Sequence, residues 1–319
     1  MVNIKDIAKA AGVSISTVSY ALNGVDKVNE KTRQRIIKIA DDINYIPNRA
    51  ARTLKTKATD VIAIYLADFG GNFYGRLLDA LKISLEKYHY EMIVCTGIKS
   101  HRFLPEQMVD AAVILDWKFT TEDILKYTHM GRKFVVLDRE IDSDLVGQIL
   151  VDNYHGVELV LSRLTETKTD KVFIISGPKN SFDNEQRLSH SVEWLESHAI
   201  DYEVLEGKFT ELSGYFAAKQ LVKAYQGQPL KVISLNDEMA VGVYRYLLNT
   251  DLTIGKDILI AGFDNSEMGQ VVTPRLTSVG YEIDQWSDMI ATMLNAMLND
   301  QAAEKLWLPV HLTEGGSLG

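Results

Sequence analysis

The sequence predicts an all-α helix-turn-helix domain at the N-terminus, followed by an α/β core with parallel, doubly wound sheets. Three observations lead to this fold class: a helix, glycine turn and helix near the start, a change in the sign of the charge after residue 58, and an alternation of short apolar runs with helical patterns from residue 59 onward. We expect the helix-turn-helix domain to cover residues 1–46, a linker to cover 47–58 and the core to cover 59–319.

Two short amphipathic helices are predicted in the first 22 residues. The apolar positions of the first helix recur at helical spacing and are Ile4, Ile7, Ala8 and Ala11. Gly12 then interrupts the pattern. A second helix is expected to begin near Ser14, which can cap it, and to end at Leu22, with Val18 and Leu22 facing inward. Helix, glycine turn and helix in this order are typical of the helix-turn-helix motif.

The outward face of the second helix carries short or uncharged side chains. Those expected to point outward are Ile15, Ser16, Ser19 and Tyr20, with Thr17 at the edge. Such a face can approach base edges and phosphates closely, whereas an ordinary solvated face more often carries Lys and Glu. A third helix, capped by Asn29, is expected to carry four apolar residues on one face, namely Ile36, Ile37, Ala40 and Ile43.

Charge is distributed unevenly along the chain, whose 319 residues carry a formal net charge of -9. Residues 1–58 hold 11 Lys and Arg against 5 Asp and Glu, and the remainder holds 23 against 38. A basic module attached to an acidic one favours a polyanionic partner for the first. Charges interrupt the N-terminus where an export signal needs an apolar stretch, and no run of about 18 apolar residues occurs. We therefore expect a soluble, cytoplasmic, nucleoid-associated protein.

These N-terminal segments resemble the DNA-binding segment of the lactose/galactose repressor family of bacterial transcription factors. The resemblance rests on IKDIAKAAGVSISTVSYALNG, VNEKTRQRI and NYIPNRAARTLK. It implies a recognition helix in the major groove, with three residues near bases: Ile15, Ser16 and Tyr20. The residues that it places near phosphates are Ser14, Thr17, Ser19, Asn23 and Thr32. Many members have arginine where this chain has Tyr20, so we expect the preferred half-site to differ from theirs.

The linker after Tyr45 is predicted to fold only when another contact compensates for its ordering entropy. Pro47 can start a helix, but the following segment of about two turns is too short to persist alone in water. The family resemblance implies that two such helices pair in the minor groove, where a leucine at the position of Leu54 wedges into the central base step. The DNA-binding candidates of the linker are Asn48, Arg49, Leu54 and Lys55.

Eight short apolar runs in the rest of the chain are predicted strands. They cover residues 61–67, 92–95, 111–115, 134–137, 172–175, 204–205, 232–235 and 259–262. The helix-length patterns cover residues 77–87, 156–164, 184–197, 213–224, 238–248 and 285–298. Strands that alternate with helices form parallel sheets covered by helices, and ligands bind outside the carboxyl ends of such strands.

Polar and aromatic side chains follow the predicted strands. The effector-binding candidates are Asp68, Phe69, Phe73, Asp116, Trp117, Asp138, Asn153, Arg187, Phe209, Asn236 and Asp264. Carboxylates, amides and an arginine mixed with aromatic rings suit a neutral polyhydroxylated ligand, because each hydroxyl donates and accepts hydrogen bonds while sugar C–H faces stack on rings. The competing interpretation of each acidic residue is a helix N-cap. Asp237 in particular is expected to be a cap, since a predicted helix starts directly after it.

The family resemblance continues through LDREID, LVDNYHG, IISGP, SLNDEMAVGV, ILIAGFDN and TPRLTSV. It implies an effector-binding and dimerisation core built like a periplasmic sugar-binding protein, with two lobes around a cleft. The positions that hold ligand hydroxyls in relatives correspond to Arg187, Asn236 and Asp264, and Phe209 corresponds to a stacking aromatic residue. Two departures stand out. His190 replaces the usual glycine, and the stretch between residues 95 and 111 is short, so its helix is expected to be abbreviated or lost.

No catalytic constellation competes with this interpretation. The sequence has no phosphate-binding glycine loop of the Walker type, no pair of histidines at metal spacing and no Gly-x-Ser-x-Gly elbow. Its single cysteine, Cys95, excludes a disulfide framework and any multi-cysteine metal site. We expect no enzyme activity, no cofactor and no metal.

The interpretation that follows is a ligand-responsive repressor of carbohydrate-utilisation genes. It would bind a palindromic double-stranded DNA operator as a homodimer and sense a sugar, with no membrane partner. Two alternatives keep the architecture: a non-sugar effector such as a purine, and a ligand or protein partner that acts as a corepressor. An exported solute-binding protein would share the core but begin with a signal peptide. A sugar-modifying enzyme would need a positioned nucleophile or base.

Overall fold

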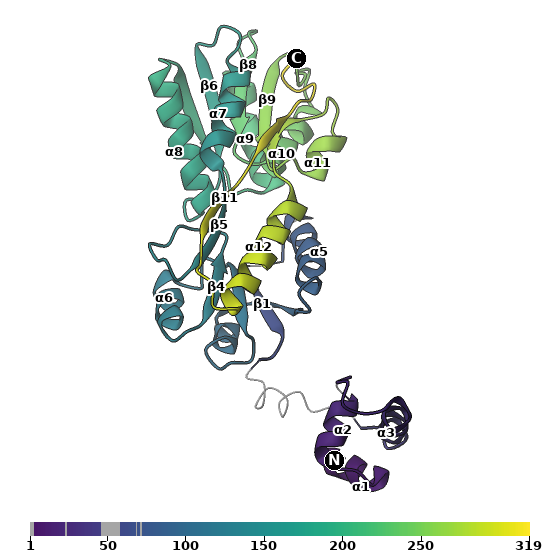
Figure 1. The fold of residues 1–319 in the computed structure, drawn as a ribbon. Helices are drawn as coiled ribbons and strands as arrows, with labels where there is room; N and C mark the ends of the chain where they lie inside the picture. The colour runs from purple at the N-terminus through teal and green to yellow at the C-terminus, as the bar shows by residue number, and fades with distance from the viewer. Residues whose placement is uncertain (1–2, 23, 46–57, 68, 71) are drawn as a thin grey trace. The chain divides into compact units, whose positions relative to one another are not determined.

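The computed structural model describes residues 3–22, 24–45, 58–67, 69–70 and 72–319. It consists of two compact units, Met1–Thr59 and Asp60–Gly319. The first unit is helical, and the second contains two β-sheets flanked by helices (Figure 1). Several residues singled out in the sequence lie outside the described residues, namely Asn23, Asn48, Arg49, Leu54, Lys55 and Asp68.

The described residues of the first unit form three helices: α1 (Ile4–Ala11), α2 (Ile15–Leu22) and α3 (Glu30–Asp42). Each begins after a side chain that accepts a backbone N–H, which satisfies one of the donors that a helix start leaves free. These capping residues are Asn3, Ser14 and Asn29. Gly12 ends α1 with a φ of 61°, a left-handed conformation that glycine adopts without strain.

A small apolar core joins the three helices. Ile7, Val18 and Ile36 are fully buried and meet at its centre, one from each helix. The sequence predicted that Ile37 lies on the apolar face of α3. That prediction is wrong, because Ile37 is 41% exposed. Ile36 and Ala40 already fill the inward stripe, and consecutive helical residues point about 100° apart.

The second unit is built on two six-stranded sheets. The first sheet has the strand order β11-β5-β4-β3-β1-β2, and all its neighbours pair in parallel. Its strands are β1 (Val61–Leu66), β2 (Glu91–Thr96), β3 (Ala111–Leu115), β4 (Lys133–Val136), β5 (Gly147–Val151) and β11 (Lys305–Leu308). The second sheet has the order β12-β10-β9-β8-β6-β7. Its strands are β6 (Lys171–Ser176), β7 (Asp201–Glu206), β8 (Leu230–Ser234), β9 (Ile258–Phe263), β10 (Thr277–Gly280) and β12 (His311–Thr313).

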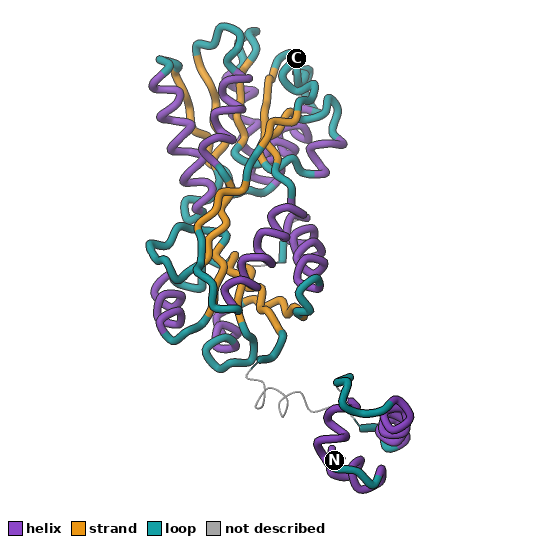
Figure 2. The backbone as a smooth tube through the Cα atoms, in the orientation of Figure 1, coloured by secondary structure: helices purple, strands orange, loops and turns teal. Residues whose placement is uncertain are grey.

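Helices flank both sheets, so that each sheet and its helices form a lobe (Figure 2). The helices of the first lobe are α5 (Asn72–Glu86), α6 (Thr121–His129) and α12 (Ile283–Leu298). Those of the second lobe are α7 (Asn153–Leu164), α8 (Phe182–Ser197), α9 (Glu211–Ala224), α10 (Asp237–Leu247) and α11 (Glu267–Val271). The chain passes between the lobes three times, after β5, after β10 and after β11. Among the strands that the structure describes, only β12 runs antiparallel to its neighbour.

Alternation along β1 explains why the first sheet is covered on both faces. Ile62, Ile64 and Leu66 face one core, and Ala63 and Tyr65 face another on the opposite side. Successive strand residues point to opposite faces of a sheet, and a strand buried on both sides reads as a continuous apolar run. Each fully buried aliphatic side chain contributes about 1.5–3 kcal/mol relative to an exposed one.

Two glycines let α9 and α10 approach each other closely. A Cβ atom on Gly214 of α9 would lie 1.9 Å from the carbonyl oxygen of Met239 in α10. In return, a Cβ on Gly242 of α10 would lie 2.0 Å from the carbonyl oxygen of Glu211 in α9. Backbone atoms cannot yield as a flexible side chain can, so this contact requires glycine at both positions.

The fold class predicted from the sequence is confirmed, and each of the eight predicted strands overlaps an observed one. The predicted ranges omit the helices α6 and α11 and the strands β5, β10, β11 and β12. These strands are short, and β10 has the sequence TSVG, which lacks the apolar run on which the prediction relied. Between β2 and β3 the chain forms a 3₁₀-helix, η1 (Ile98–Phe103). Among the described residues, no helix is both long and apolar enough to cross a membrane.

Candidate functional site

The outward face of α2 presents small polar groups and one apolar side chain. Ser14, Ile15 and Ser16 are exposed, and Ile15 is 46% exposed. The Ser14 hydroxyl lies 2.8 Å from that of Thr17, and it also accepts the Thr17 N–H at 3.1 Å. Because the cap holds Ser14 and Thr17 in place, the start of α2 offers hydroxyl groups in a fixed arrangement.

Tyr20 lies on the same face as Ser16, one helical turn further along. Its ring packs partly against the apolar core of the first unit, and the Lys27 ammonium lies 5.3 Å from the ring centre. The other candidates of this unit, Thr17, Ser19 and Thr32, are half-buried. Their contacts to bases or phosphates stay predictions.

A buried arginine organises the carboxyl ends of the second sheet. Arg187, in the second turn of α8, is only 3% exposed. Its Nε–H donates to Asn153 Oδ1 at 2.7 Å and its Nη1 donates to the Leu235 carbonyl oxygen at 2.7 Å. The guanidinium carbon lies 3.6 Å from the ring centre of Phe263. Such contacts fix the plane of the guanidinium, so any remaining N–H groups have set directions.

Asp264 follows β9 and shares the arginine. Its Oδ1 accepts from Arg187 Nη1 at 3.3 Å and from the Tyr281 hydroxyl at 3.4 Å. Burial raises the pKa of Asp264 to about 6, although the neighbouring Arg187 charge opposes this shift. Burial likewise raises the pKa of Tyr281 well above its ordinary value. Arg187, Asp264 and Tyr281 therefore form one hydrogen-bonded group that joins α8 to the ends of β9 and β10.

Phe209 follows β7 and Asn236 follows β8, two other strands of the second sheet. Asn236 donates from Nδ2 to the Phe209 carbonyl oxygen at 3.2 Å. A Cβ on Gly177 would lie 2.3 Å from the Phe209 ring, so only glycine at position 177 leaves room for the ring in this place. Phe209 itself has a φ of 57°, which is rare for a large side chain. A strained aromatic residue beside polar groups is typical of ligand sites.

The prediction that Asp237 caps α10 is wrong. The N-cap is Asn236, whose Oδ1 accepts the Met239 N–H at 3.0 Å, and Asp237 is the first helical residue. The buried Asp237 carboxyl accepts from the Ser266 N–H and the Ser278 hydroxyl, both at 2.6 Å. Burial, together with the Asp264 charge, raises its pKa to about 8. Asp237 therefore joins α10 to α11 and β10.

The Asp116 carboxylate contacts other residues of the first lobe. Its side chain is fully buried, with one oxygen 3.3 Å from His101 Nε2 and the other accepting the Lys118 N–H at 3.0 Å. The His101 ring stacks on Phe119 with ring centres 4.2 Å apart. The effector contact predicted for Asp116 is untested, and the carboxylate has these two partners already.

Asp138 and Arg139 follow β4 at the same end of the first sheet. The Arg139 guanidinium donates to both carboxylate oxygens of Asp138, and burial raises the pKa of that carboxyl although Arg139 opposes the shift. The charge of Asp183, in the second lobe, raises it further. Charged groups of both lobes therefore influence the Asp138 carboxyl.

Aromatic rings accompany these polar groups. Phe69 and Trp117, which follow strands of the first sheet, are 61% and 55% exposed. Phe73 is half-buried against Trp286, whose ring edge meets Tyr281 at a centre distance of 5.7 Å. Sequence reasoning missed Tyr281, Trp286 and Asp183. Tyr281 could have been found as an aromatic residue directly after β10, but the sequence analysis did not predict that strand.

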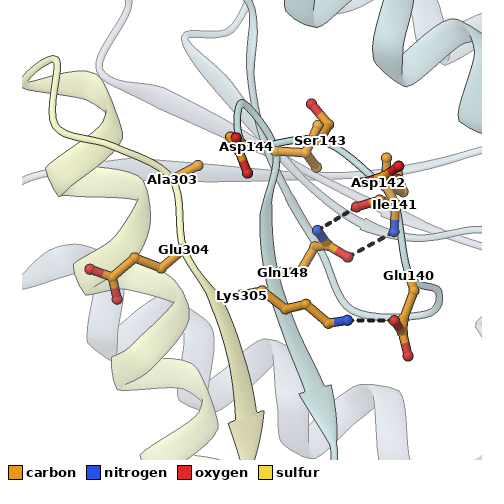
Figure 3. A pocket seen from close by; sticks show the side chains of 10 residues that line it. Glu140, Ile141, Asp142, Ser143, Asp144, Gln148, Ala303, Glu304 and Lys305 are labelled. Carbon is orange, nitrogen blue, oxygen red and sulfur yellow. Dashed lines mark hydrogen bonds and ion pairs between the residues drawn. The ribbon is translucent and has the colours of Figure 1, made fainter.

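A separate hollow of about 500 Å³ lies beside the first sheet, between the loop after β4 and the start of β11 (Figure 3). Glu140, Asp142, Asp144 and Glu304 surround it, and Lys305 pairs with Glu140. The Gln148 amide fastens the loop by bonding both backbone groups of Ile141 at 2.8 Å. The residues that line it do not include any of the effector-binding candidates.

Comparison with known proteins agrees with this architecture. The model of bacterial regulatory proteins of the lacI family matches residues 3–48, and that of a periplasmic-binding-protein-like domain matches residues 161–318. The probable HTH-type transcriptional repressor ExuR of Bacillus subtilis (strain 168) is 28% identical over an alignment of 321 positions, which covers 96% of this chain and 95% of the relative.

Two solved structures extend the comparison. A sugar-binding transcriptional regulator of the LacI family from Enterococcus faecalis is 43% identical with a TM-score of 0.75, over 82% of this chain and 98% of that chain. The Lac repressor dimer bound to operator and the anti-inducer ONPF is 24% identical with a TM-score of 0.86, over 99% of both chains, which shows a shared fold.

These comparisons, together with the fold, define a transcriptional regulator with a helix-turn-helix domain and a periplasmic-binding-protein-like core, and not an enzyme. The chain belongs to the LacI family of bacterial regulatory proteins.

Proposed function

We propose that this protein represses carbohydrate-utilisation genes as a homodimer that binds a palindromic operator and responds to a sugar. In this proposal α2 enters the major groove of each half-site, and the sugar binds at the carboxyl ends of the second sheet. It would act in the cytoplasm, at the nucleoid. The names of the relatives support the proposal, since one is a sugar-binding regulator and another is an operator-bound dimer.

The observation that carries the sugar assignment is the arrangement around Arg187. Its guanidinium is fixed by Asn153, Leu235 and Phe263, beside the Asp264 carboxyl. A planar donor beside a carboxylate acceptor can bind two adjacent hydroxyls of one ring, because each hydroxyl donates to one group and accepts from the other. The effector-binding candidates with exposed or half-buried rings, Phe69, Phe73, Trp117 and Phe209, supply apolar faces for sugar C–H groups.

The remaining candidates keep their assignments as proposals. DNA contacts are proposed for Ser14, Ile15, Ser16, Thr17, Ser19, Tyr20, Asn23, Thr32, Asn48, Arg49, Leu54 and Lys55. Coupling between the two sites follows if the sugar favours one relative placement of the lobes over another. A 100-fold change in operator affinity requires a difference of about 2.8 kcal/mol between the two states.

The direct test combines ligand screening with DNA binding. Thermal unfolding is followed in the presence of mono- and oligosaccharides and, as a separate arm, purines, and each stabilising compound is then titrated by calorimetry. Its effect on operator binding is measured by gel shift with the full chain. A sugar that stabilises the protein and changes operator affinity supports the proposal. Stabilisation by purines alone would overturn the sugar assignment while leaving the DNA-binding function intact.

A further inference from the structure

The helix that we propose to enter the major groove carries no charge of its own. Its sequence, ISTVSYAL, contains no acidic or basic side chain. DNA presents a strongly negative surface, and the commonest base contacts in the major groove come from arginine and lysine. A recognition surface built on α2 alone would therefore lack the most frequent kind of base-reading group.

Lys27 brings a positive charge to this face from the turn that follows α2. Its ammonium lies 5.3 Å from the centre of the Tyr20 ring, within the range of a cation–π contact. Tyr20 follows Ser16 by four residues, so the two side chains are neighbours on one face of the helix. Lys27 is exposed, and it has no ion-pair partner among the residues that the structure describes.

The turn holds Lys27 in this position through several backbone contacts. The Val25 N–H donates to the Tyr20 carbonyl oxygen at 3.0 Å, and the Lys27 N–H donates to the Val25 carbonyl oxygen at 2.7 Å. The Arg33 guanidinium, from α3, donates to that same Val25 oxygen at 3.0 Å. Val28, directly after Lys27, is buried in the core of the unit. The backbone at Lys27 is therefore fixed, and its ammonium lies near the Tyr20 ring.

We propose that Lys27, supported by Tyr20, is a specificity-determining residue that reads a guanine in each operator half-site. Guanine is the base that offers two acceptors, O6 and N7, at its major-groove edge. The ring limits the conformations of the long side chain, which reduces the entropy lost when the ammonium binds. This inference rests on the proposed DNA-binding function and adds a reading residue outside the recognition helix.

The test starts by selecting preferred sites from random oligonucleotides with the full-length wild-type protein and with Lys27→Met, which keeps the stem and removes the charge. For Lys27→Met we expect loss of preference for guanine at one position of each half-site. Affinity for the wild-type operator should fall about 10-fold or more, because the contact occurs twice in a dimer. Tyr20→Leu should weaken the same guanine preference, whereas Tyr20→Phe, which keeps the ring, should preserve it.

The matched control is Lys38→Met, which removes the same charge from an exposed position on α3. It should leave the selected sequence unchanged. Titrations on operator and scrambled DNA at several salt concentrations then distinguish a base contact from a phosphate contact. A phosphate contact by Lys27 would weaken both DNAs alike and reduce the salt slope by about 0.9 per contact.

Two results would overturn the inference. One is an unchanged selected sequence for Lys27→Met, whether affinity falls uniformly or stays the same. The other is loss of the guanine preference in the Lys38→Met control. The loss seen in Lys27→Met would then be a general effect of removing a positive charge. Failure of the proposed function looks different, because the wild-type protein itself would then select no sequence over scrambled DNA.

Discussion

The Asp264 carboxylate lies 3.3 Å from the Arg187 guanidinium, yet burial outweighs this favourable charge and raises the pKa of Asp264 to about 6. At neutral pH the group is therefore an ionised acceptor close to its titration range. Protonation would convert one of its acceptor oxygens into a donor. The predictions for the effector site follow from this balance.

Affinity for a neutral sugar should fall as the pH falls through about 6, because the protonated carboxyl loses an acceptor and its attraction to Arg187. Asp264→Asn should bind more weakly at pH 7.5, by about 10-fold, and should not show the step near pH 6. Calorimetric titrations between about pH 5 and 8 measure both proteins. A step of equal size in Asp264→Asn would assign the titration to another group.

Arg187→Lys keeps the positive charge but loses the planar fork that bonds Asn153 and Leu235. Effector affinity should fall by about 10-fold or more, with operator binding by the ligand-free protein nearly unchanged, since the altered residue lies in the second unit. Arg163→Lys is the control, because Arg163 is also an ion-paired arginine, bonded to Glu314 and Glu166. Equal effector affinities for wild type and Arg187→Lys would remove Arg187 from the effector site.

Asp237→Asn should stabilise the protein increasingly as the pH rises. The folded-state pKa of Asp237 is about 8 against an ordinary value of 3.8, so the folded protein favours the neutral form. That contribution to stability is complete below the lower value and is lost as the pH rises through the higher one. Asparagine stays neutral, and its amide can serve both Ser266 and Ser278. Urea unfolding at about pH 6 and 8.5 should show a larger gain for the variant at the higher pH; the opposite trend would mean that Asp237 folds as an ion.

Gly214→Ala and Gly242→Ala should each destabilise the second lobe, by about 1–3 kcal/mol or more, because the added methyl group meets backbone across the contact between α9 and α10. Gly75→Ala is the control, since it lies in α5 with open space around its Cβ position. Chemical denaturation gives the three values. If the two interface variants were as stable as the control, α9 and α10 would have room to separate.

Leu54→Ala should weaken operator binding and reduce the bend in the operator, because the proposed wedge offsets an unstacking cost of a few kcal/mol. Affinity for random DNA should hardly change, since no charge is lost. Gel shifts on operator and scrambled DNA at one salt concentration, with a circular-permutation assay, provide the measurement. Equal losses on both DNAs would contradict the wedge.

Local sequence signals predicted the elements whose apolar pattern is continuous. The cap at Asn29 and the inward residue Ile36 follow from spacing alone, since they depend on neighbours three or four residues away. The assignment of the α10 cap to Asp237 missed by one residue, because Asn and Asp in sequence are both good caps and only the tertiary bonds to Ser266 and Ser278 separate their roles.

The sequence pattern could not predict which distant residues contact the effector-site candidates. The pairing of Asp116 with His101 depends on how η1 folds back onto the first sheet, and nothing in the local spacing indicates it. The Asp264–Tyr281 contact joins residues 17 apart, across two parallel strands of which one carries no apolar signature. Candidate positions at strand ends were therefore predictable, whereas the partners that occupy their donors and acceptors required the structure.

Trp286 gives the molecule an intrinsic spectroscopic reporter. Its indole N–H donates to the Ile149 carbonyl oxygen of β5 at 3.1 Å, and its ring touches Tyr281 where the chain has just crossed between the lobes. Trp117 and Trp307 are exposed, so solvent quenchers reach them first, whereas the buried indole of Trp286 is shielded. With Trp117, Trp194 and Trp307 replaced by phenylalanine, the tryptophan fluorescence that remains comes from Trp286. A change in its wavelength or lifetime on adding ligand would then report movement at the lobe crossing in solution, without any attached dye.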